Sequence, residues 1–385
     1  MRSAVLVEST DPSVRRPPEN PPRNTALDGL RGIAIAMVVW HHFVELNLPP
    51  GRASWLGWLR AGTGLSWTGV DLFFTLSGFL IGGILIDHRI LPHFTRVFYL
   101  RRATRILPLY FATLAIAALA VVLRLPGSYH MFPFWIYPLF LTNFAVGLTG
   151  TWDWLPLSVL WSLAVEEQFY LIAPWVAKAA SHEMIPWILA GLALLAEAFR
   201  VALMLLYPNG QLMMHVLTPF RMDALVLGVL VAWAVRSKAA CAFFDWLGGY
   251  WPVLLAGGIA ILGGLDLLQP REGSRVMGAF GYLFIASFFA LVVAVVARVR
   301  PASLVRCLEA RPLVHLGRCS YFIYLWHGLL GQAVIRALGG AEFTLNSLSG
   351  VAIVAFAVAL TWLLAAVSWR WFERPIVDWG HRYAY

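Results

Sequence analysis

Apolar residues run along this chain in long segments, separated by short stretches rich in arginine, glycine and proline. A helix of about 20 apolar residues is long enough to cross a bilayer. The pattern therefore predicts an all-α polytopic membrane protein, a bundle of about ten transmembrane helices. We expect them at residues 27–47, 65–87, 105–124, 157–178, 184–206, 220–236, 251–269, 277–298, 313–338 and 345–371.

An eleventh apolar stretch, residues 131–147, contains Pro133, Pro138 and Asn143, which is more typical of an interfacial or re-entrant segment. The arginine-rich loops decide between ten and eleven crossings, because cytoplasmic loops carry an excess of Lys and Arg. They all face the cytoplasm only if this stretch does not cross. We therefore expect ten crossings of the inner (plasma) membrane, with both termini cytoplasmic.

Composition supports this class. The chain is 60% hydrophobic and 13% charged, whereas a soluble domain is about 25% charged. We attribute the net charge of +9 to cytoplasmic loops, and not to nucleic-acid binding, since no soluble basic domain is predicted. The three cysteines show no metal-binding or paired spacing. We expect a disordered cytoplasmic tail at 1–26, one membrane domain at 27–375 and a short cytoplasmic tail at 376–385.

The first predicted helix carries Asp28, Arg31, His41 and His42. Arg31 and His42 are eleven residues apart, so they lie on one stripe of the helix, about 16 Å apart along its axis. Ionisable groups inside a membrane cost free energy and often mark functional sites. The structural alternative is a histidine bonded to a neighbouring helix and an arginine that extends to the interface.

Other polar residues interrupt the later helices. Asp71 could lie equally well at the membrane interface or in a functional site. Gly78 and Gly82 indicate close packing between helices. Glu166 and Glu167 lie midway along an apolar segment. The following residues are expected to line a polar cavity: Asp28, His41, Asp71, Ser77, Glu167, Arg221, Asp223, Tyr324 and His327. Each could also be purely structural.

Arg96, Arg101, Arg102 and Arg105 cluster at one predicted boundary of the membrane. Such arginines can simply hold a loop in the cytoplasm or bind anionic lipid. A third reading is a phosphate clamp, because guanidinium groups match phosphate oxygens.

The motifs LDGLRG, DLFFTLSGFLIGGIL, RRATRILPLYF, WSLAVEEQFYL, FRMDALVLG, SYFIYLWH and FERP occur in this order. The chain thereby resembles the acyltransferase-3 family of integral-membrane acyltransferases, from about Leu27 to Pro375. The resemblance implies ten helices with cytoplasmic termini. It also implies transfer of an acyl group, often acetyl, from acyl-coenzyme A to a hydroxyl of a surface polysaccharide, lipopolysaccharide or glycolipid. In some members the acceptor is a macrolide.

The family has a motif in which ten residues separate an arginine from a histidine, and this motif falls on Arg31 and His42. His41 stands where many members carry an aromatic residue. Its RxxR falls on Arg102 and Arg105, its SGF begins at Ser77, and its glutamate falls on Glu166. Some relatives carry a further C-terminal domain. This sequence ends at Tyr385, so the resemblance implies action alone or with a separate extracytoplasmic transferase.

The resulting hypothesis is a metal-free acyltransferase. Arg101, Arg102 and Arg105 bind the phosphates of acyl-coenzyme A. The catalytic residues are His42, Arg31 and Glu166, with His42 as the general base or a transient acyl carrier and Glu166 supporting His42. Membrane lipid surrounds the protein. The rival from another class is a transporter or flippase with a His/Glu relay. Against it, the sequence contains no inverted repeat.

Overall fold

The computed structural model of the chain describes residues 24–51, 53–124, 132–207, 209–267, 276–340, 343–383 and 385. The predicted N-terminal tail, residues 1–26, falls almost entirely outside these ranges.

The first helix begins at Thr25, where the side chain of Asn24 accepts a hydrogen bond from the amide of Ala26. This is the usual way in which asparagine caps a helix.

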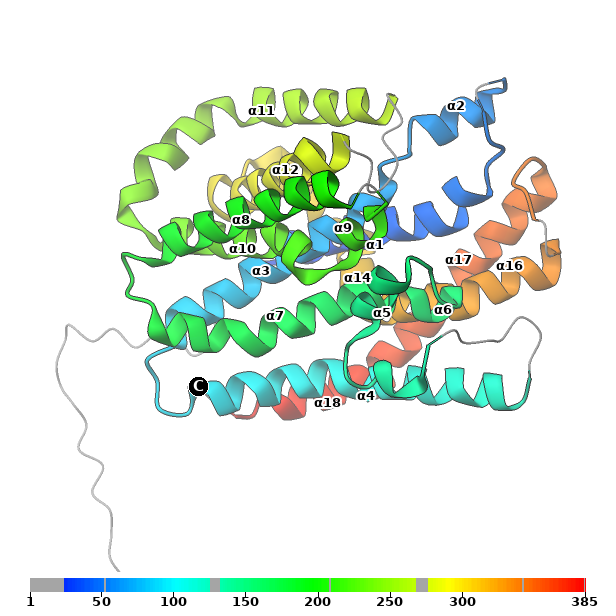
Figure 1. Cartoon of the computed structure of the whole chain (residues 1–385), viewed down its shortest axis with the longest axis horizontal. Coiled ribbons are helices and arrows are strands. Elements are labelled where there is room, and N and C mark those ends of the chain that lie inside the picture. Colours follow the sequence, from blue (N-terminus) through cyan, green and yellow to red (C-terminus); the bar gives the residue numbers. More distant parts are fainter. Residues whose placement is uncertain are drawn as a thin grey trace, which may run out of the picture.

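All regular structure in the described residues is helical (Figure 1). The helices are α1 Thr25–Phe43, α2 Trp55–Ala61, α3 Gly69–His88, α4 Phe94–Val122, α5 Thr142–Thr149, α6 Leu155–Ser158, α7 Leu160–Ala179, α8 Ile185–Leu206, α9 Gln211–Val216, α10 Thr218–Arg236, α11 Cys241–Leu267, α12 Tyr282–Ala294, α13 Ala302–Leu308, α14 Arg311–Arg318, α15 Ser320–Trp326, α16 Gln332–Gly339, α17 Leu348–Ser368 and α18 Arg374–Gly380.

Single 3₁₀ or π turns extend or join several of these helices. They are η1 Glu45–Asn47, η2 Ser66–Thr68, η3 Phe134–Ile136, η4 Lys238–Ala240, η5 Met277–Gly281, η6 Val295–Val299, η7 His327–Gly331 and η8 Trp369–Glu373.

Within the described residues, seven helical stretches are long and apolar enough to cross a membrane. They are Trp55–His88, Phe94–Val122, Ile185–Leu206, Gln211–Arg236, Lys238–Asp266, Met277–Val299 and Leu348–Gly380. The prediction of an all-α polytopic membrane protein is confirmed. The remaining three predicted segments are also helical, as α1, α7 and α14 to α16. They are shorter or more polar, so the count of ten stays a prediction.

Two helices begin earlier than the apolar pattern predicts. α4 starts at Phe94 and not near residue 105, so the arginine cluster lies on a helix and not in a loop. Phe94, Val97 and Phe98 are buried at helical spacing, and arginine is itself a good helix former. α11 likewise begins at Cys241, ten residues before the predicted boundary.

The ambiguous stretch at 131–147 forms only the turn η3 and the eight-residue helix α5 over its described part, 132–147. Eight residues rise about 12 Å, far less than a bilayer, so the described part of this stretch contains no helix long enough to cross. At the other end of the chain, the predicted 376–385 tail is partly helical. α18 reaches Gly380, which packs against Thr104 of α4.

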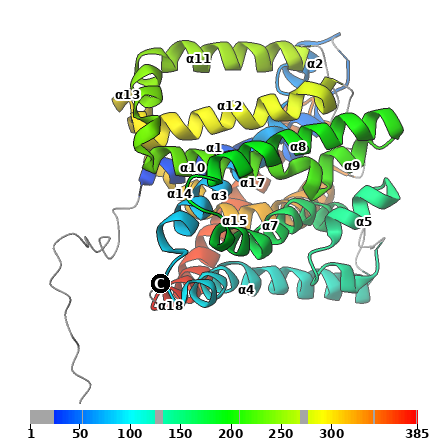
Figure 2. The same cartoon turned by 60° about the vertical axis from the view of Figure 1, so that its left-hand side comes forward.

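The helices lie side by side in layers (Figures 1 and 2). α11 forms one outer edge, α4 with α18 forms the opposite edge, and α1, α3 and α10 lie between them. Glycines bring the central helices together. Gly78 of α3 packs on the backbone of Leu225, and Gly228 of α10 packs on the backbone of Thr75. The packing role predicted for Gly78 is confirmed, since a side chain at either glycine would overlap the facing helix.

Candidate active site

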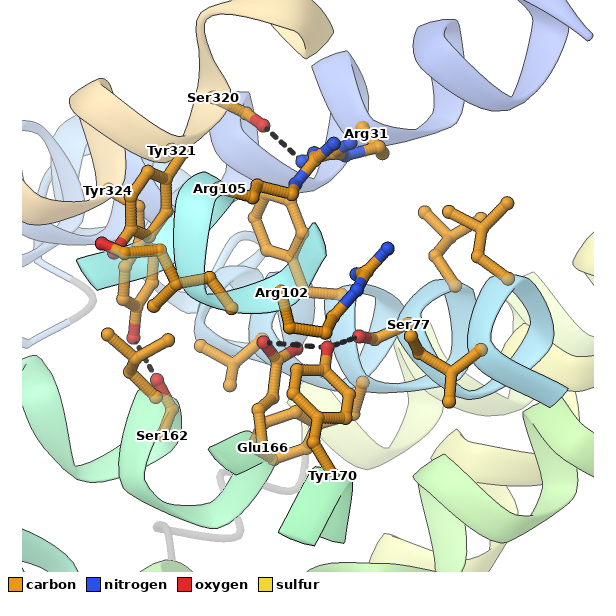
Figure 3. A pocket seen from close by; sticks show the side chains of 18 residues that line it. Arg31, Ser77, Arg102, Arg105, Ser162, Glu166, Tyr170, Ser320, Tyr321 and Tyr324 are labelled. Carbon is orange, nitrogen blue, oxygen red and sulfur yellow. Dashed lines mark hydrogen bonds between the residues drawn. The ribbon is translucent and has the colours of Figure 1, made fainter. Parts of the chain in front are cut away.

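A chamber of about 130 Å³ lies inside the bundle, where α1, α3, α4, α7 and α15 converge (Figure 3). Apolar side chains make up part of its wall. The polar side chains that line it are Arg31, Ser77, Arg102, Arg105, Ser162, Glu166, Tyr170, Ser320, Tyr321 and Tyr324. The five helices are far apart in sequence, so the chamber exists only in the folded bundle.

Helical periodicity explains why these side chains face one space. On α7, Ser162, Glu166 and Tyr170 recur every four residues and therefore form one stripe. On α4, Arg102 and Arg105 are three residues apart and share a face. The chamber is thus built from polar stripes on helices that are otherwise apolar.

Hydroxyl groups link the walls of the chamber (Figure 3). Tyr170 donates to Glu166 Oε2 at 3.4 Å and also bonds to the Ser77 hydroxyl on α3. Arg31 Nη2 donates to the Ser320 hydroxyl at 3.2 Å. These bonds join α7 to α3 and α1 to α15, so the lining is held by contacts between helices.

The charge of the lining is positive. Three guanidinium groups, those of Arg31, Arg102 and Arg105, face the chamber together with the carboxyl group of Glu166. The same field reaches His381, just beyond the end of α18. Burial, followed by the charges of Arg101, Arg105 and Arg102, lowers the pKa of the His381 imidazole. A chamber of this kind attracts anions.

Arg101, predicted as part of a phosphate clamp, is engaged elsewhere. Its Nε and Nη2 donate to the carbonyl of Tyr383 at 3.1 and 2.6 Å, and its guanidinium lies 4.4 Å from the centre of the Tyr385 ring. Arg101 precedes Arg102 by one residue, about 100° around the helix, so the two point in different directions. Of the three arginines predicted to form the clamp, Arg102 and Arg105 line the chamber, where Arg31 of α1 joins them, and Arg101 does not.

His42 lies near the end of α1, about three helical turns beyond Arg31, and is not among the chamber-lining residues. Its Nδ1 is 2.9 Å from the carbonyl oxygen of Val38. Because a carbonyl can only accept, this nitrogen carries the hydrogen, and Nε2 of the neutral ring holds the lone pair. The ring lies 4.7 Å from that of His327 and 4.9 Å from that of His41.

A row of rings connects the chamber with His42. Tyr324, which lines the chamber, lies 6.0 Å from His327, and His327 lies 4.7 Å from His42. The predicted support of His42 by Glu166 is not a direct contact between the two side chains in the described residues. Among the described residues the rings of His327 and His41 lie against that of His42, whereas Glu166 bonds to Tyr170.

Two other polar residues of α1 have partners outside the chamber. His41 Nδ1 lies 2.9 Å from Glu45 Oε2, and Ser66 donates to the same carboxylate. Asp28 forms an ion pair with Arg318 at 3.7 Å. Both residues were predicted to line the cavity. The structure places them instead in contacts that tie the two ends of α1 to neighbouring segments.

Asp71, Arg221 and Asp223 also lie outside the chamber lining, in a buried ionic network. Arg221 Nη2 donates to Asp71 at 2.7 Å, and Arg200 pairs with Asp223 at 2.8 Å. The guanidinium of Arg221 lies 4.4 Å from the ring centre of Tyr282. Because these contacts join α3, α8, α10 and α12, we interpret the three residues as structural.

Glu167 does not line the chamber, and its buried Oε1 has no hydrogen-bond partner in the described residues. Sequence reasoning missed Tyr170, although its position four residues after Glu166 puts both on one face. The described residues contain no group of three or more His, Cys, Asp or Glu that could hold a metal ion. The expectation of metal-free chemistry stays a prediction.

Comparison with known proteins gives one family. The model described as an acyltransferase domain matches residues 24–366 of this chain. No solved structure matches it at a significant level.

Three bacterial relatives illustrate the similarity. O-acetyltransferase OatA of Staphylococcus aureus is 27% identical over 371 residues, covering 91% of this chain and 56% of the relative. The putative peptidoglycan O-acetyltransferase YrhL of Bacillus subtilis is 29% identical, covering 92% and 55%. Peptidoglycan O-acetyltransferase OatA of Listeria monocytogenes is 27% identical, covering 91% and 55%. The chain thus spans little more than half the length of these relatives.

Proposed function

Because this chain belongs to the acyltransferase domain family, we propose that it is a membrane O-acyltransferase that moves an acetyl group from acetyl-coenzyme A to a hydroxyl group of a cell-envelope glycan. The observation that carries the proposal is the chamber itself. It offers three guanidinium groups at one end, and a row of rings leads from it to a histidine with a lone pair on Nε2.

The cationic lining supports a donor that bears phosphate groups. Arg31, Arg102 and Arg105 can place several N–H donors on phosphate oxygens, and the geometry of guanidinium suits such pairs. Coenzyme A carries phosphates at one end and its thioester at the other. With the phosphates at the arginines, the arm extends along α1 toward His42, about 16 Å further along the helix axis.

His42 supplies the base in this scheme. Its Nε2 removes the proton of the acceptor hydroxyl, and the oxygen attacks the thioester carbonyl carbon. A C–O bond forms, the C–S bond breaks, and the proton is finally returned to the thiolate sulfur. A general base of this kind accelerates a reaction by about 10²–10⁴-fold.

The names of the relatives support the choice of acceptor. Two of the three are described as acetylating peptidoglycan, so a carbohydrate hydroxyl of the cell envelope is the acceptor that the similarity favours. A macrolide or another secondary metabolite is the alternative that the family leaves open.

The arginine-rich end of the chamber is also the basis of the proposed topology. The first turns of α4, which carry the arginines, lie beside α18 and the C-terminus at one end of the bundle (Figure 2). We place this end in the cytoplasm, where coenzyme A is available, in accordance with the excess of positive charge on cytoplasmic segments. The glycan would then approach from the opposite end, nearer to His42.

The test uses the full chain, purified and reconstituted in lipid nanodiscs. It is incubated with acetyl-coenzyme A labelled in the acetyl group and with soluble peptidoglycan fragments. We expect label in the glycan, and a rate about 10²–10⁴-fold lower for His42→Ala. His182→Ala is the matched control, since His182 lies exposed between α7 and α8.

Two results would contradict the proposal. The first is full activity of His42→Ala. The second is the absence of labelled product with every acceptor while the protein moves substrate across sealed vesicles, which would favour the transporter.

A further inference from the structure

The π turn η7, His327–Gly331, interrupts the helix between α15 and α16. Turns of this type place an additional residue in a helix and occur frequently at functional sites. Here the turn separates His327 from Gln332 by five residues, and both side chains reach the C-terminal end of α1. The contacts of this turn therefore bear directly on His42.

One contact holds the backbone of His42. Gln332 Nε2 donates to the His42 carbonyl oxygen at 2.8 Å, and Asn47 Nδ2 donates to the same oxygen at 3.2 Å. Carbonyl oxygens in the last turn of a helix have no N–H donor within the helix. Gln332 supplies that partner from a segment 290 residues away, so it fixes the end of α1 relative to η7.

A second contact holds the ring of His42. His327 lies against it at 4.7 Å, with an angle of 64° between the ring planes. His327 Nδ1 lies 3.1 Å from the carbonyl of Ile323 and 2.8 Å from that of Tyr324, so it carries the hydrogen. Its Nε2 lone pair is buried and has no hydrogen-bond partner in the described residues.

Close packing keeps both contacts in place. The ring of Phe43 fills the position that a side chain at Gly331 would take, so η7 lies directly against α1. Phe43 is fully buried. The turn can therefore not shift along α1 without breaking this contact.

We propose that η7 positions His42 for acetyl transfer, with Gln332 fixing its backbone and the ring of His327 packing against its imidazole. This inference rests on the proposed function. Both contacts keep Nε2 of His42 in one position while it takes the hydroxyl proton. The proton leaves through His42 to the thiolate sulfur when the C–S bond breaks.

Two substitutions at His327 test the ring contact. His327→Ala removes the ring, whereas His327→Phe keeps a planar ring beside His42. We expect kcat to fall about 2- to 10-fold in His327→Ala, the range for a lost aromatic contact, with an unchanged KM for acetyl-coenzyme A. His327→Phe should recover part of the loss.

Gln332→Leu tests the backbone contact, with Gln211→Leu at an exposed position of α9 as the matched control. We expect a lower kcat for Gln332→Leu only. A second readout does not depend on acetyl transfer: the rate at which diethyl pyrocarbonate modifies His42, measured by mass spectrometry of the full chain. This rate should rise several-fold in Gln332→Leu and stay unchanged in the control.

The outcomes distinguish the two proposals. If the wild-type protein transfers no acetyl group, the proposed function fails, whatever the modification rates. If it does transfer acetyl, a wild-type kcat in His327→Ala, no recovery in His327→Phe, or an unchanged modification rate of His42 in Gln332→Leu would each overturn the role of η7.

Discussion

Replacing Asp71 by asparagine should destabilise the bundle strongly, because Arg221 would keep its charge without the carboxylate that pairs with it. The two side chains are 1–2% exposed and their charged atoms are 2.7 Å apart. At this distance, and with an effective dielectric constant of about 20, the attraction is about 6 kcal/mol. The nearest other acid of the network, Asp223, is held by Arg200.

The expected loss is smaller than this attraction, because the pair also loses hydration when it is buried. Removing one partner of a buried ion pair typically costs about 3–5 kcal/mol. Two further nitrogens of Arg221, Nε and Nη1, already have no hydrogen-bond partner in the described residues. The variant therefore leaves a buried guanidinium with little compensation besides aromatic rings, of which Tyr282 lies at 4.4 Å and Trp67, Phe74 and Trp161 at about 6 Å. We expect a loss near the middle of that range.

The assay is unfolding of the purified protein in mixed micelles with increasing dodecyl sulfate, followed by tryptophan fluorescence. Asp71→Asn is compared with the wild type, with Arg221→Met and with the double variant. The double variant should be more stable than Asp71→Asn, because it has no unpaired charge. A loss below about 1 kcal/mol in Asp71→Asn, or a double variant as unstable as both single changes combined, would refute the reasoning.

Three other predictions concern the chamber and its frame. Arg102→Ala should raise the KM for acetyl-coenzyme A about tenfold with little change in kcat, whereas Arg101→Ala should leave the KM unchanged; initial rates at varied donor concentration measure both. Tyr170→Phe removes the hydroxyl that bonds to Glu166 and should lower kcat by a few-fold to about tenfold, with wild-type elution in gel filtration. Gly228→Leu should prevent α10 from packing on α3, and gel filtration should show aggregated protein.

Much of the fold follows from the apolar pattern, because a segment long enough to cross a bilayer must form a helix. The pattern is less informative about helix ends. The arginines between Arg96 and Arg105 resemble a loop in a hydropathy profile, yet they lie on the first three turns of α4. Phe94 and Phe98 bury one face of those turns, and the arginines occupy the others. Periodicity on one helix face reveals this, whereas average polarity does not.

The site was only partly predictable. Arg31, Arg102 and Glu166 were selected as polar groups on apolar helices, and the structure brings them into one chamber. Gln332 could not be found in this way, because its contact with His42 depends on the π turn before it. Local spacing along an ideal helix gives no sign of such a turn.

The contact between α3 and α10 limits how the protein can open. Their backbones touch at Gly78 and Gly228, so no rotation of a side chain can widen the gap between them, and the two helices must move as one rigid body. Any widening of the chamber, which is partly open, must therefore come from its other walls. Among them is α4, which lies at the edge of the bundle with α18 and bears Arg102 and Arg105.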